Sequence, residues 1–312
     1  MEPSAFLLVA LATITSCMIG ANNASNATAT LTGSKVIPHE GGSVIFALGL
    51  VSGAVFEGEK LSRAIEGGAL EGSLGTWSVG VILGVTICMI IVATAMGFPL
   101  PVAQALYGAA MGSGIFLGIP LNAHSVTSVL ISWGTTPLMA AGASTVISRL
   151  ERRLPARSVM TITMTYGTLT IGTCFYTAYV FGANTIGLIA GMLRGEFGWP
   201  FSVAVTAASA GLGGAIFGRG VSATMGEGIS SMGPRTASAA QMGGALTVHL
   251  FTQLGMPVSI THAIVGGVTG SALSKGITAI NFATWIRIAL LWIVTPLVTL
   301  AMAWLIHASA LG

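Results

Sequence analysis

Charge is what this sequence has least of. Only 7% of its 312 residues are Asp, Glu, Lys or Arg, whereas soluble globular proteins carry about 25%. Hydrophobic residues make up 53% and lie in long continuous runs. Because lipid offers the backbone no hydrogen-bond partner, continuous apolar runs predict membrane-spanning α-helices rather than alternating barrel strands. We therefore expect a multi-pass protein of the cell membrane, embedded in and in contact with the lipid bilayer.

Cysteines and clustered basic residues are also scarce. Cys17, Cys88 and Cys174 lie in apolar runs, which indicates small core residues rather than a disulfide framework or a zinc site. The net charge is only +3, and no basic face remains once the apolar runs are buried, so no nucleic-acid partner is expected. The first run is preceded by Met1-Glu2-Pro3-Ser4 without Lys or Arg and is predicted to be a retained span, not a signal peptide.

The apolar runs differ in length and continuity. A span needs about 20 apolar residues, and four runs meet this requirement: 76–96, 126–147, 160–181 and 282–307. Between them lie shorter runs interrupted by Gly, Ser, Thr or Asn: 6–20, 44–56, 99–119, 201–217, 237–254 and 257–274. Such interruptions are typical of broken or re-entrant helices that face protein or a cavity. We predict an all-α membrane protein with about 10–12 embedded segments.

The basic residues gather at the middle of the chain. Arg149, Arg152, Arg153 and Arg157 fall within nine residues, while both terminal regions lack Lys and Arg. The positive-inside rule predicts a cytoplasmic loop here and both termini outside. Each half then crosses the membrane an odd number of times, in opposite orientations. The predicted division is a first inverted repeat at 1–148, a basic linker at 149–157 and a second inverted repeat at 158–312.

Three motif pairs support this internal duplication. Their members keep the same order, with offsets of 162, 161 and 158 residues. The pairs are Gly20-Ala21-Asn22 with Gly182-Ala183-Asn184, Gly53-Ala54-Val55-Phe56 with Gly214-Ala215-Ile216-Phe217, and Pro99…Gln104-Ala105…Gly108…Gly112-Ser113 with Pro257…His262-Ala263…Gly266…Gly270-Ser271.

The first candidate site is a polar stretch beginning at Gly20. It contains Asn22, Asn23, Ser25, Asn26 and Thr28, which would be costly in lipid without partners. The composition predicts a helix break at 20–23, followed by a new helix whose N-terminal N–H groups suit an anion. The alternative is a polar contact between helices inside the bundle.

The second half repeats this arrangement at Asn184 and Thr185. If the halves are inverted, the two breaks meet near the membrane midplane, where secondary transporters bind substrate. The third motif pair would complete the site with Gln104 from the first half and Ser259, Thr261 and His262 from the second.

These last residues follow prolines, which suit helix starts. Their hydroxyl, imidazole and backbone donors could then converge on an oxyanion; the alternative for His262 is a satisfied buried histidine. Gly108 and Gly112, like Gly266 and Gly270, have the spacing of close helix packing.

Residues 20–27, Gly-Ala-Asn-Asn-Ala-Ser-Asn-Ala, resemble the Gly-Ala-Asn-Asp-x-x-Asn-Ala signature of the inorganic phosphate transporter (PiT) family. Residues 211–234 and 240–271 resemble its second-half regions. The resemblance covers most of the chain and implies an inverted-repeat helical transporter, not an enzyme. It further implies phosphate transport coupled to Na⁺ or H⁺, commonly by a homodimer, with sulfate permeases among the relatives.

The sequence departs from this family pattern at the aspartates. Asn23 and Thr185 occupy their positions, and carboxylates are preferred ligands of hard cations. These two residues remain possible cation contacts, but neither a metal site nor a cofactor is predicted, and the coupling ion is left open between H⁺ and Na⁺. Fewer acceptors also suit sulfate, which has no proton to donate. Phosphate is the first expectation and sulfate a close second.

The remaining charges and the other function classes complete the predictions. Glu57 and Glu227 are expected in solvated interfacial segments, whereas Arg219 and Arg235 either pair with acids or contact an entering anion. An anion channel needs a continuous polar lining, and a membrane enzyme needs grouped catalytic or metal-binding residues. Polarity here is concentrated in duplicated patches, and the five histidines are scattered. The expected function is therefore secondary active transport of a small tetrahedral oxyanion by alternating access.

Overall fold

The computed structural model of the chain is built from helices. It describes residues 3–33, 37–97, 100–153, 159–218, 234–274, 276 and 282–311. Its helices are α1 (Pro3–Asn23), α2 (Ser25–Gly33), α3 (His39–Glu57), η1 (Gly58–Leu61), α4 (Thr76–Ala95), α5 (Val102–Phe116), α6 (Ala123–Glu151), α7 (Val159–Phe181), η2 (Gly182–Ile186), α8 (Gly187–Phe197), α9 (Trp199–Phe217), α11 (Pro234–Gln253), α12 (Ile260–Leu273) and α13 (Phe282–Leu311).

Six stretches of the described chain are long and apolar enough to cross a membrane. They are Ser4–Thr28, Glu40–Leu61, Thr76–Ala95, Met164–Phe197, Trp199–Phe217 and Trp285–Ala310. In the same part of the chain no β-strand forms, and isolated bridges join only Glu66 to Leu70 and Leu70 to Leu121. The predicted all-α membrane class is confirmed.

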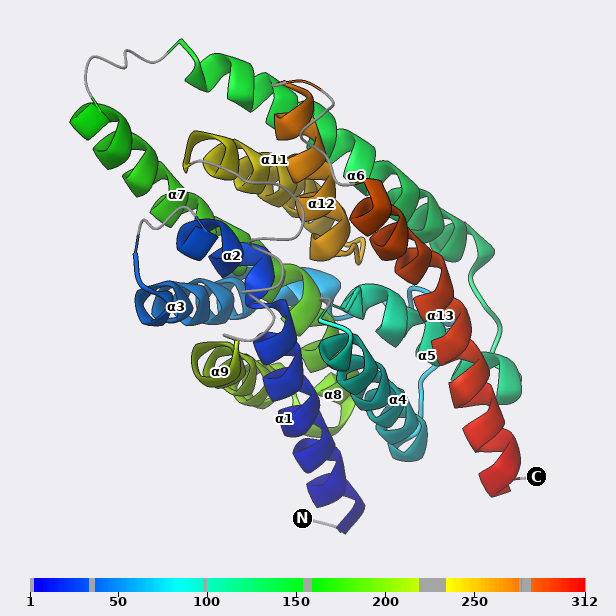
Figure 1. The fold of residues 1–312 in the computed structure, drawn as a ribbon. Helices are drawn as coiled ribbons and strands as arrows, with labels where there is room; N and C mark the ends of the chain where they lie inside the picture. The colour runs from blue at the N-terminus through cyan, green and yellow to red at the C-terminus, as the bar shows by residue number, and fades with distance from the viewer. Residues whose placement is uncertain are drawn as a thin grey trace.

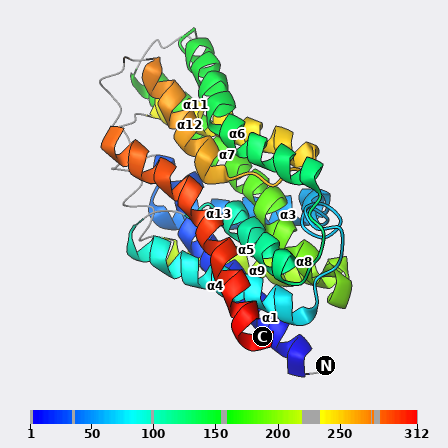
Figure 2. The same cartoon turned by 90° about the vertical axis from the view of Figure 1, so that its right-hand side faces the viewer.

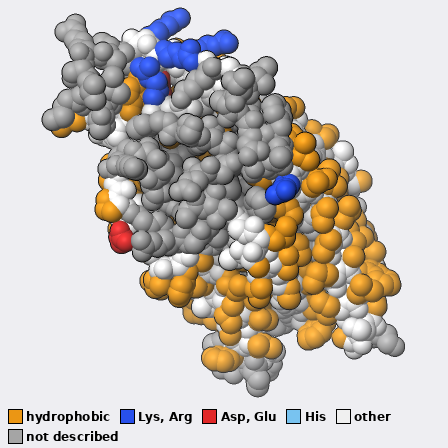
Figure 3. Space-filling view, viewed as in Figure 1, with side chains coloured by type: hydrophobic (Ala, Val, Ile, Leu, Met, Phe, Trp, Pro, Cys, Tyr) orange, Lys and Arg blue, Asp and Glu red, His pale blue; other side chains and the backbone are white. Residues whose placement is uncertain are grey.

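The distribution of side chains is that of a protein in lipid. Large apolar residues such as Phe6 and Leu138 are exposed, and Figure 3 shows hydrophobic side chains covering much of one flank. Several asparagines and glutamines are instead buried, among them Asn22, Asn26 and Gln241. Because buried amides need partners, they locate the polar centre of the bundle.

The two halves of the chain are interleaved. Helix α1 packs on α9 and α3 on α7, while α5 packs on α13 and α12 on α6. Both termini lie at one end of the molecule, and the end of α6 lies at the other (Figures 1 and 2). The predicted inverted topology, in which the central loop and the termini lie on opposite membrane faces, stays a prediction. Residues 154–157 of that loop lie outside the described residues.

Glycines allow the closest helix crossings. A Cβ atom on Gly108 of α5 would overlap the carbonyl oxygen of Pro296 in α13, and one on Gly266 of α12 would overlap that of Pro137 in α6. Each short helix thus crosses the proline of a long helix from the other half. The spacing of these glycines predicted such packing, and the crossings fix where α5 and α12 begin.

The helix break predicted at 20–23 is smaller than expected. Helix α1 continues to Asn23, Ala24 is a single turn residue, and its N–H bonds to the carbonyl oxygen of Gly20 at 2.9 Å. In the second half the corresponding irregularity is the π-helical turn η2. At both places most backbone N–H and C=O groups therefore keep their helical hydrogen bonds. The polar groups left to contact a ligand are mainly side-chain amides.

Candidate functional site

Asn22 joins the end of one helix to the start of another. Its side-chain N–H donates to the Thr94 hydroxyl of α4 at 2.9 Å, and its Oδ1 accepts from the backbone N–H of Leu100 at 2.6 Å. Phe98 and Pro99 lie outside the described residues. The asparagine therefore fixes the turn that leads into α5.

Asn184 does the same in the second half. Its side-chain N–H donates to the Thr252 hydroxyl of α11 at 2.9 Å, and its Oδ1 accepts from the backbone N–H of Val258 at 3.2 Å. The two residues that sequence matching paired therefore make equivalent bonds, one before α5 and one before α12.

A relay of amides leads from Asn22 into the centre of the bundle. Asn23 donates to Oδ1 of Asn22 at 3.2 Å, and Asn26 donates to Oδ1 of Asn23 at 2.9 Å. The backbone N–H of Leu100 can only donate, so it fixes the orientation of Asn22 and, in turn, of Asn23 and Asn26. The relay ends on Oδ1 of Asn26, a buried acceptor with no partner among the described residues.

The start of α12 meets the end of this relay. The side-chain N–H of Asn26 lies 3.4 Å from Oγ1 of Thr261, across 235 positions of sequence. Ser259 caps α12, its Oγ accepting from the backbone N–H of His262. Within the described part of the chain, the hydroxyl hydrogens of Ser259 and Thr261 have no acceptor, so both can donate to an anion. We define the amide cluster as Asn22, Asn23, Asn26, Ser259 and Thr261.

The other predicted residues of the first helix pair have local roles. The Ser25 hydroxyl donates to the carbonyl of Asn22, and the Thr28 hydroxyl donates to that of Ala24. Thr185 is buried in η2 and is not part of the hydrogen bonds that join the amide cluster. Gln241 was not predicted: it is fully buried on α11, donates to the Ala27 carbonyl and accepts from Thr173 at 2.9 Å. A buried glutamine in an apolar helix was the available signal.

Gln104 and His262 lie in a different place from the amide cluster. Both line a cavity of about 590 Å³ between α6, α12 and α13. The His262 ring lies 4.0 Å from that of Trp292, and its Nδ1 is 3.2 Å from the carbonyl oxygen of Trp133. The structure thus brings together the predicted residues at Asn22, Asn23, Asn26, Ser259 and Thr261, and separates His262 and Gln104 from them.

A second cavity reaches the amide cluster from one side. It measures about 890 Å³, lies between α1 and α4, and has Asn22 and Thr94 on its wall. Its remaining lining is apolar apart from Cys17. The polar end of this cavity is therefore the place where a charged solute would first meet side-chain amides.

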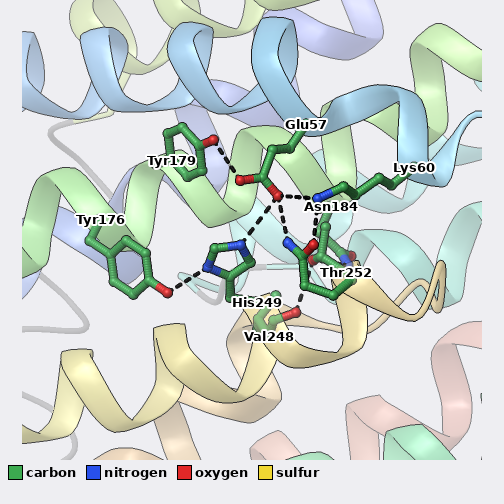
Figure 4. Close-up of polar contacts among 9 residues, drawn as sticks. Glu57, Lys60, Tyr176, Tyr179, Asn184, Val248, His249 and Thr252 are labelled. Carbon is green, nitrogen blue, oxygen red and sulfur yellow. Dashed lines mark hydrogen bonds and ion pairs between the residues drawn. The ribbon is translucent and has the colours of Figure 1, made fainter.

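The charged residues depart from the sequence expectations. Glu57 is not freely solvated: its carboxylate contacts Tyr179, Lys60, Gln253 and His249 (Figure 4). Arg235 is held by the carbonyl of Glu151 at 3.2 Å and lies over the Tyr166 ring, which favours structural pairing over anion contact. Lys35, Arg219, Glu227 and Lys275 lie outside the described residues.

A sequence profile described as the phosphate transporter family matches residues 19–303. The chain belongs to the phosphate transporter family. Membership in this transport class confirms the prediction that the chain is not an enzyme, and the predicted family resemblance is confirmed with it.

Several named proteins are similar to this family member. A Rhizobium meliloti protein named as a probable low-affinity inorganic phosphate transporter is 26% identical, with 92% of this chain and 91% of that protein covered. The sulfate permease CysP of Bacillus subtilis is 25% identical, with 92% and 83% covered. A solved structure titled "The sodium-dependent phosphate transporter" aligns with a TM-score of 0.83 at 20% identity, covering 98% of this chain and 99% of that one. At that identity the structural likeness shows the fold.

Carboxylate ligands are absent where a cation site would need them. The whole chain contains nine acidic residues, all of them glutamate. Within the described ranges, no group of three His, Cys, Asp or Glu residues could hold a metal ion. Asn23 offers an amide oxygen that already accepts from Asn26, which makes it a weak cation ligand.

Proposed function

We propose that this family member is a secondary transporter that moves phosphate through the amide cluster by alternating access between its two halves. The membrane fold and the family support transport of this anion class. Asn23 and Asn26 come from the first half and Ser259 and Thr261 from the second. A site shared between two repeats can open to either face when the repeats rock against each other.

The observation that carries the proposal is the pairing of Asn26 with Thr261. Its surroundings hold uncharged donors, namely the Ser259 and Thr261 hydroxyls. Beside them lies Oδ1 of Asn26, a buried acceptor with no partner among the described residues. Phosphate that retains one proton needs both kinds of group: its oxygens accept hydrogen bonds and its P–O–H donates one. Such a neutral site binds the anion reversibly, because no fixed positive charge traps it.

Sulfate is the second candidate. A fully ionised sulfate has no proton to donate, so Oδ1 of Asn26 would face it as an acceptor and weaken its binding. On the other hand, the cluster lacks any carboxylate that would repel sulfate, and one relative is named as a sulfate permease. We therefore expect both anions to enter, with phosphate preferred.

Proton coupling is favoured over sodium coupling. Sodium is a hard cation best held by carboxylate oxygens, and this chain has Asn23 and Thr185 where the family signature has aspartate. The solved neighbour is titled sodium-dependent, so sodium coupling is the alternative. Sodium coupling can be tested directly. If sodium is the coupling ion, a sodium gradient without a pH gradient would drive anion uptake.

The function is tested with purified protein in proteoliposomes. Labelled phosphate or sulfate is placed outside vesicles loaded with either unlabelled anion, and exchange is followed at equal pH. We expect saturable exchange of both anions and stronger competition by phosphate. Protein-free vesicles are the control. If neither anion exchanges, the transport proposal is wrong.

Orientation and assembly are part of the same proposal. We propose that both termini face outside, that the arginine-rich segment after α6 faces the cytoplasm, and that two copies form a homodimer. Single cysteines placed near Ser4 and at Arg153, in a background lacking the native cysteines, should be labelled by an impermeant reagent from opposite faces. Labelling of both positions from one face would contradict the topology.

A further inference from the structure

A polar network of side chains lies between α3, α7 and α11, outside the amide cluster. Glu57, the last residue of α3, contacts three of its members through Oε2: Lys60 at 2.8 Å, Gln253 at 2.6 Å and His249 at 3.2 Å. Its Oε1 accepts from the Tyr179 hydroxyl at 2.8 Å. Figure 4 shows these groups converging on one carboxylate from three elements. We define this set, with Tyr176, as the Glu57 network.

The hydrogen bonds of His249 allow it to change charge in place. A carboxylate only accepts, so Nε2 of His249 carries a hydrogen toward Glu57. Its Nδ1 lies 2.6 Å from the Tyr176 hydroxyl. That hydroxyl can donate to a neutral imidazole or accept from an imidazolium. Both protonation states of His249 therefore keep two hydrogen-bond partners.

The network reaches the molecular surface on one side. The side chains of His249 and Glu57 are 25% and 20% exposed, and that of Lys60 is 40% exposed. The His249 side chain is therefore accessible from the surface of the molecule rather than enclosed in its core. Imidazole is the side chain that ordinarily changes charge near neutral pH, whereas lysine and tyrosine ordinarily do so well above it.

The network is also connected to the transport site. His249 precedes Thr252 by one turn of α11, and Thr252 accepts from Asn184, which in turn holds the N–H of Val258 next to Ser259. Ionised Glu57 and protonated Lys60 balance each other, so a proton on His249 gives the network a net positive charge. That charge strengthens the α11–α3 contact and favours an anion at the start of α12.

We propose that His249, held by Glu57 and Tyr176, is the site that binds the coupling proton. This proposal rests on the proposed transport function. In the step, the lone pair of Nδ1 takes a proton from water, and the Tyr176 hydroxyl changes from donor to acceptor. The proton returns to water when the site opens to the opposite face. Proton and anion then favour each other's binding, as a shared coupling energy requires.

Several other titratable groups near these helices have contacts of their own. In the described part of α2, α9 and η2 there are none. Arg235, Glu151 and Tyr166 interact at the opposite end of α11. Arg194 pairs with Glu59 at 2.8 Å, and His262 faces Trp133 and Trp292. Cys174 is buried on α7. His124 and Arg149 also lie on α6, which packs against α11, and Glu40 lies on α3. Among the histidines whose side chains the structure describes, His249 is the one that contacts a carboxylate.

The test separates anion exchange from proton-driven accumulation. His249→Gln keeps a donor for Glu57 and an acceptor for Tyr176 but cannot bind the proton. Exchange at equal pH needs no net proton movement, so we expect it to persist in this variant, with lower anion affinity because the coupled proton no longer favours anion binding. Wild-type accumulation should rise about tenfold per coupled proton for each pH unit across the membrane. His249→Gln should lose that dependence.

A matched control is His307→Gln, which alters a buried histidine bonded to Ser78 and distant in the fold from the network; it should retain proton-driven accumulation. In Glu57→Gln the carboxylate that pairs with the charged imidazole is replaced by a neutral amide, so proton-driven accumulation should fall.

Three results would overturn the proposal. Undiminished proton-driven accumulation in His249→Gln would remove His249 from the coupling. Loss of exchange in both His249→Gln and Glu57→Gln would make the network a structural support. Absence of exchange in the wild-type protein would overturn the transport function itself, and the His249 proposal with it. Failure of the His249 proposal alone would leave wild-type exchange intact, so the two failures can be told apart.

Discussion

The side-chain N–H of Asn26 lies 3.4 Å from the Thr261 hydroxyl oxygen, although 235 positions separate the two residues in sequence. This contact joins the polar part of the first half to the start of α12 in the second. It also leaves Oδ1 of Asn26 as a buried acceptor. The proposed preference for phosphate follows from that oxygen.

Asn26→Ala removes the acceptor while leaving Asn22 and its bond to Leu100 in place. A hydrogen bond involving a charged group contributes about 1.5–3 kcal/mol, so we expect phosphate affinity to fall about tenfold or more. Sulfate affinity should fall less, because sulfate has no proton to donate. Competition of each unlabelled anion against labelled phosphate measures the difference. Ser113→Ala, which removes a buried hydroxyl bonded to its own helix, is the control. Equal losses for both anions would show that Asn26 does not discriminate.

Asn22→Ala and Asn184→Ala should each destabilise the protein. Either change leaves a backbone N–H, of Leu100 or of Val258, without its acceptor. An unsatisfied buried group costs about 1–3 kcal/mol, so thermal unfolding in detergent should occur at lower temperature and anion affinity should fall. Asn22→Asp and Asn184→Asp keep the acceptor oxygen and should lose less stability. Wild-type unfolding temperatures in both alanine variants would place the support of α5 and α12 elsewhere.

Gly108→Ala and Gly266→Ala test the crossings of α5 with α13 and of α12 with α6. The added Cβ would overlap a proline carbonyl in each case, and overpacking typically costs about 1–3 kcal/mol. We expect lower thermal stability and slower exchange. Gly142→Ala is the matched control, because nothing lies within 4 Å of its Cβ position. If all three variants unfold alike, the crossings are looser than the structure shows.

Asn23→Asp tests the choice of coupling ion. The substitution restores the carboxylate of the family signature and keeps the acceptor that Asn26 uses. We expect anion uptake to become stimulated by an inward sodium gradient, because a carboxylate suits a hard cation. Uptake by the wild-type protein should not respond to sodium. A sodium response in the wild type would return sodium to the mechanism despite the missing aspartate.

Much of the fold could be predicted because its signals are local. Runs of apolar residues specify helices in lipid whatever their neighbours are, and the glycine spacings specify close crossings. The structure corrected the size of the break near Ala24, since the backbone N–H of Ala24 still bonds to Gly20. Side-chain amides that bond to one another, rather than capping a new helix, allow that continuity.

Less of the site could be predicted, because a polar group's role depends on its partner. His262 and Thr261 are neighbours in one motif, yet only Thr261 reaches the amide cluster, since successive helix positions point in different directions. Glu57 was expected in solvated surroundings for the same reason: its partners His249 and Gln253 lie far along the chain.

The sequence alone determined that this is an all-helical membrane protein of the phosphate transporter family, without aspartate at the two signature positions. The two related halves remain a prediction from its motif pairs. Composition and motif order suffice for these conclusions, since each residue contributes to them separately. Only the tertiary structure decided that Asn26 contacts Thr261, that the His262 ring packs on Trp292 and that His249 contacts Glu57. Hydrogen bonds form over about 3 Å, and only packing brings residues so distant in sequence within that range.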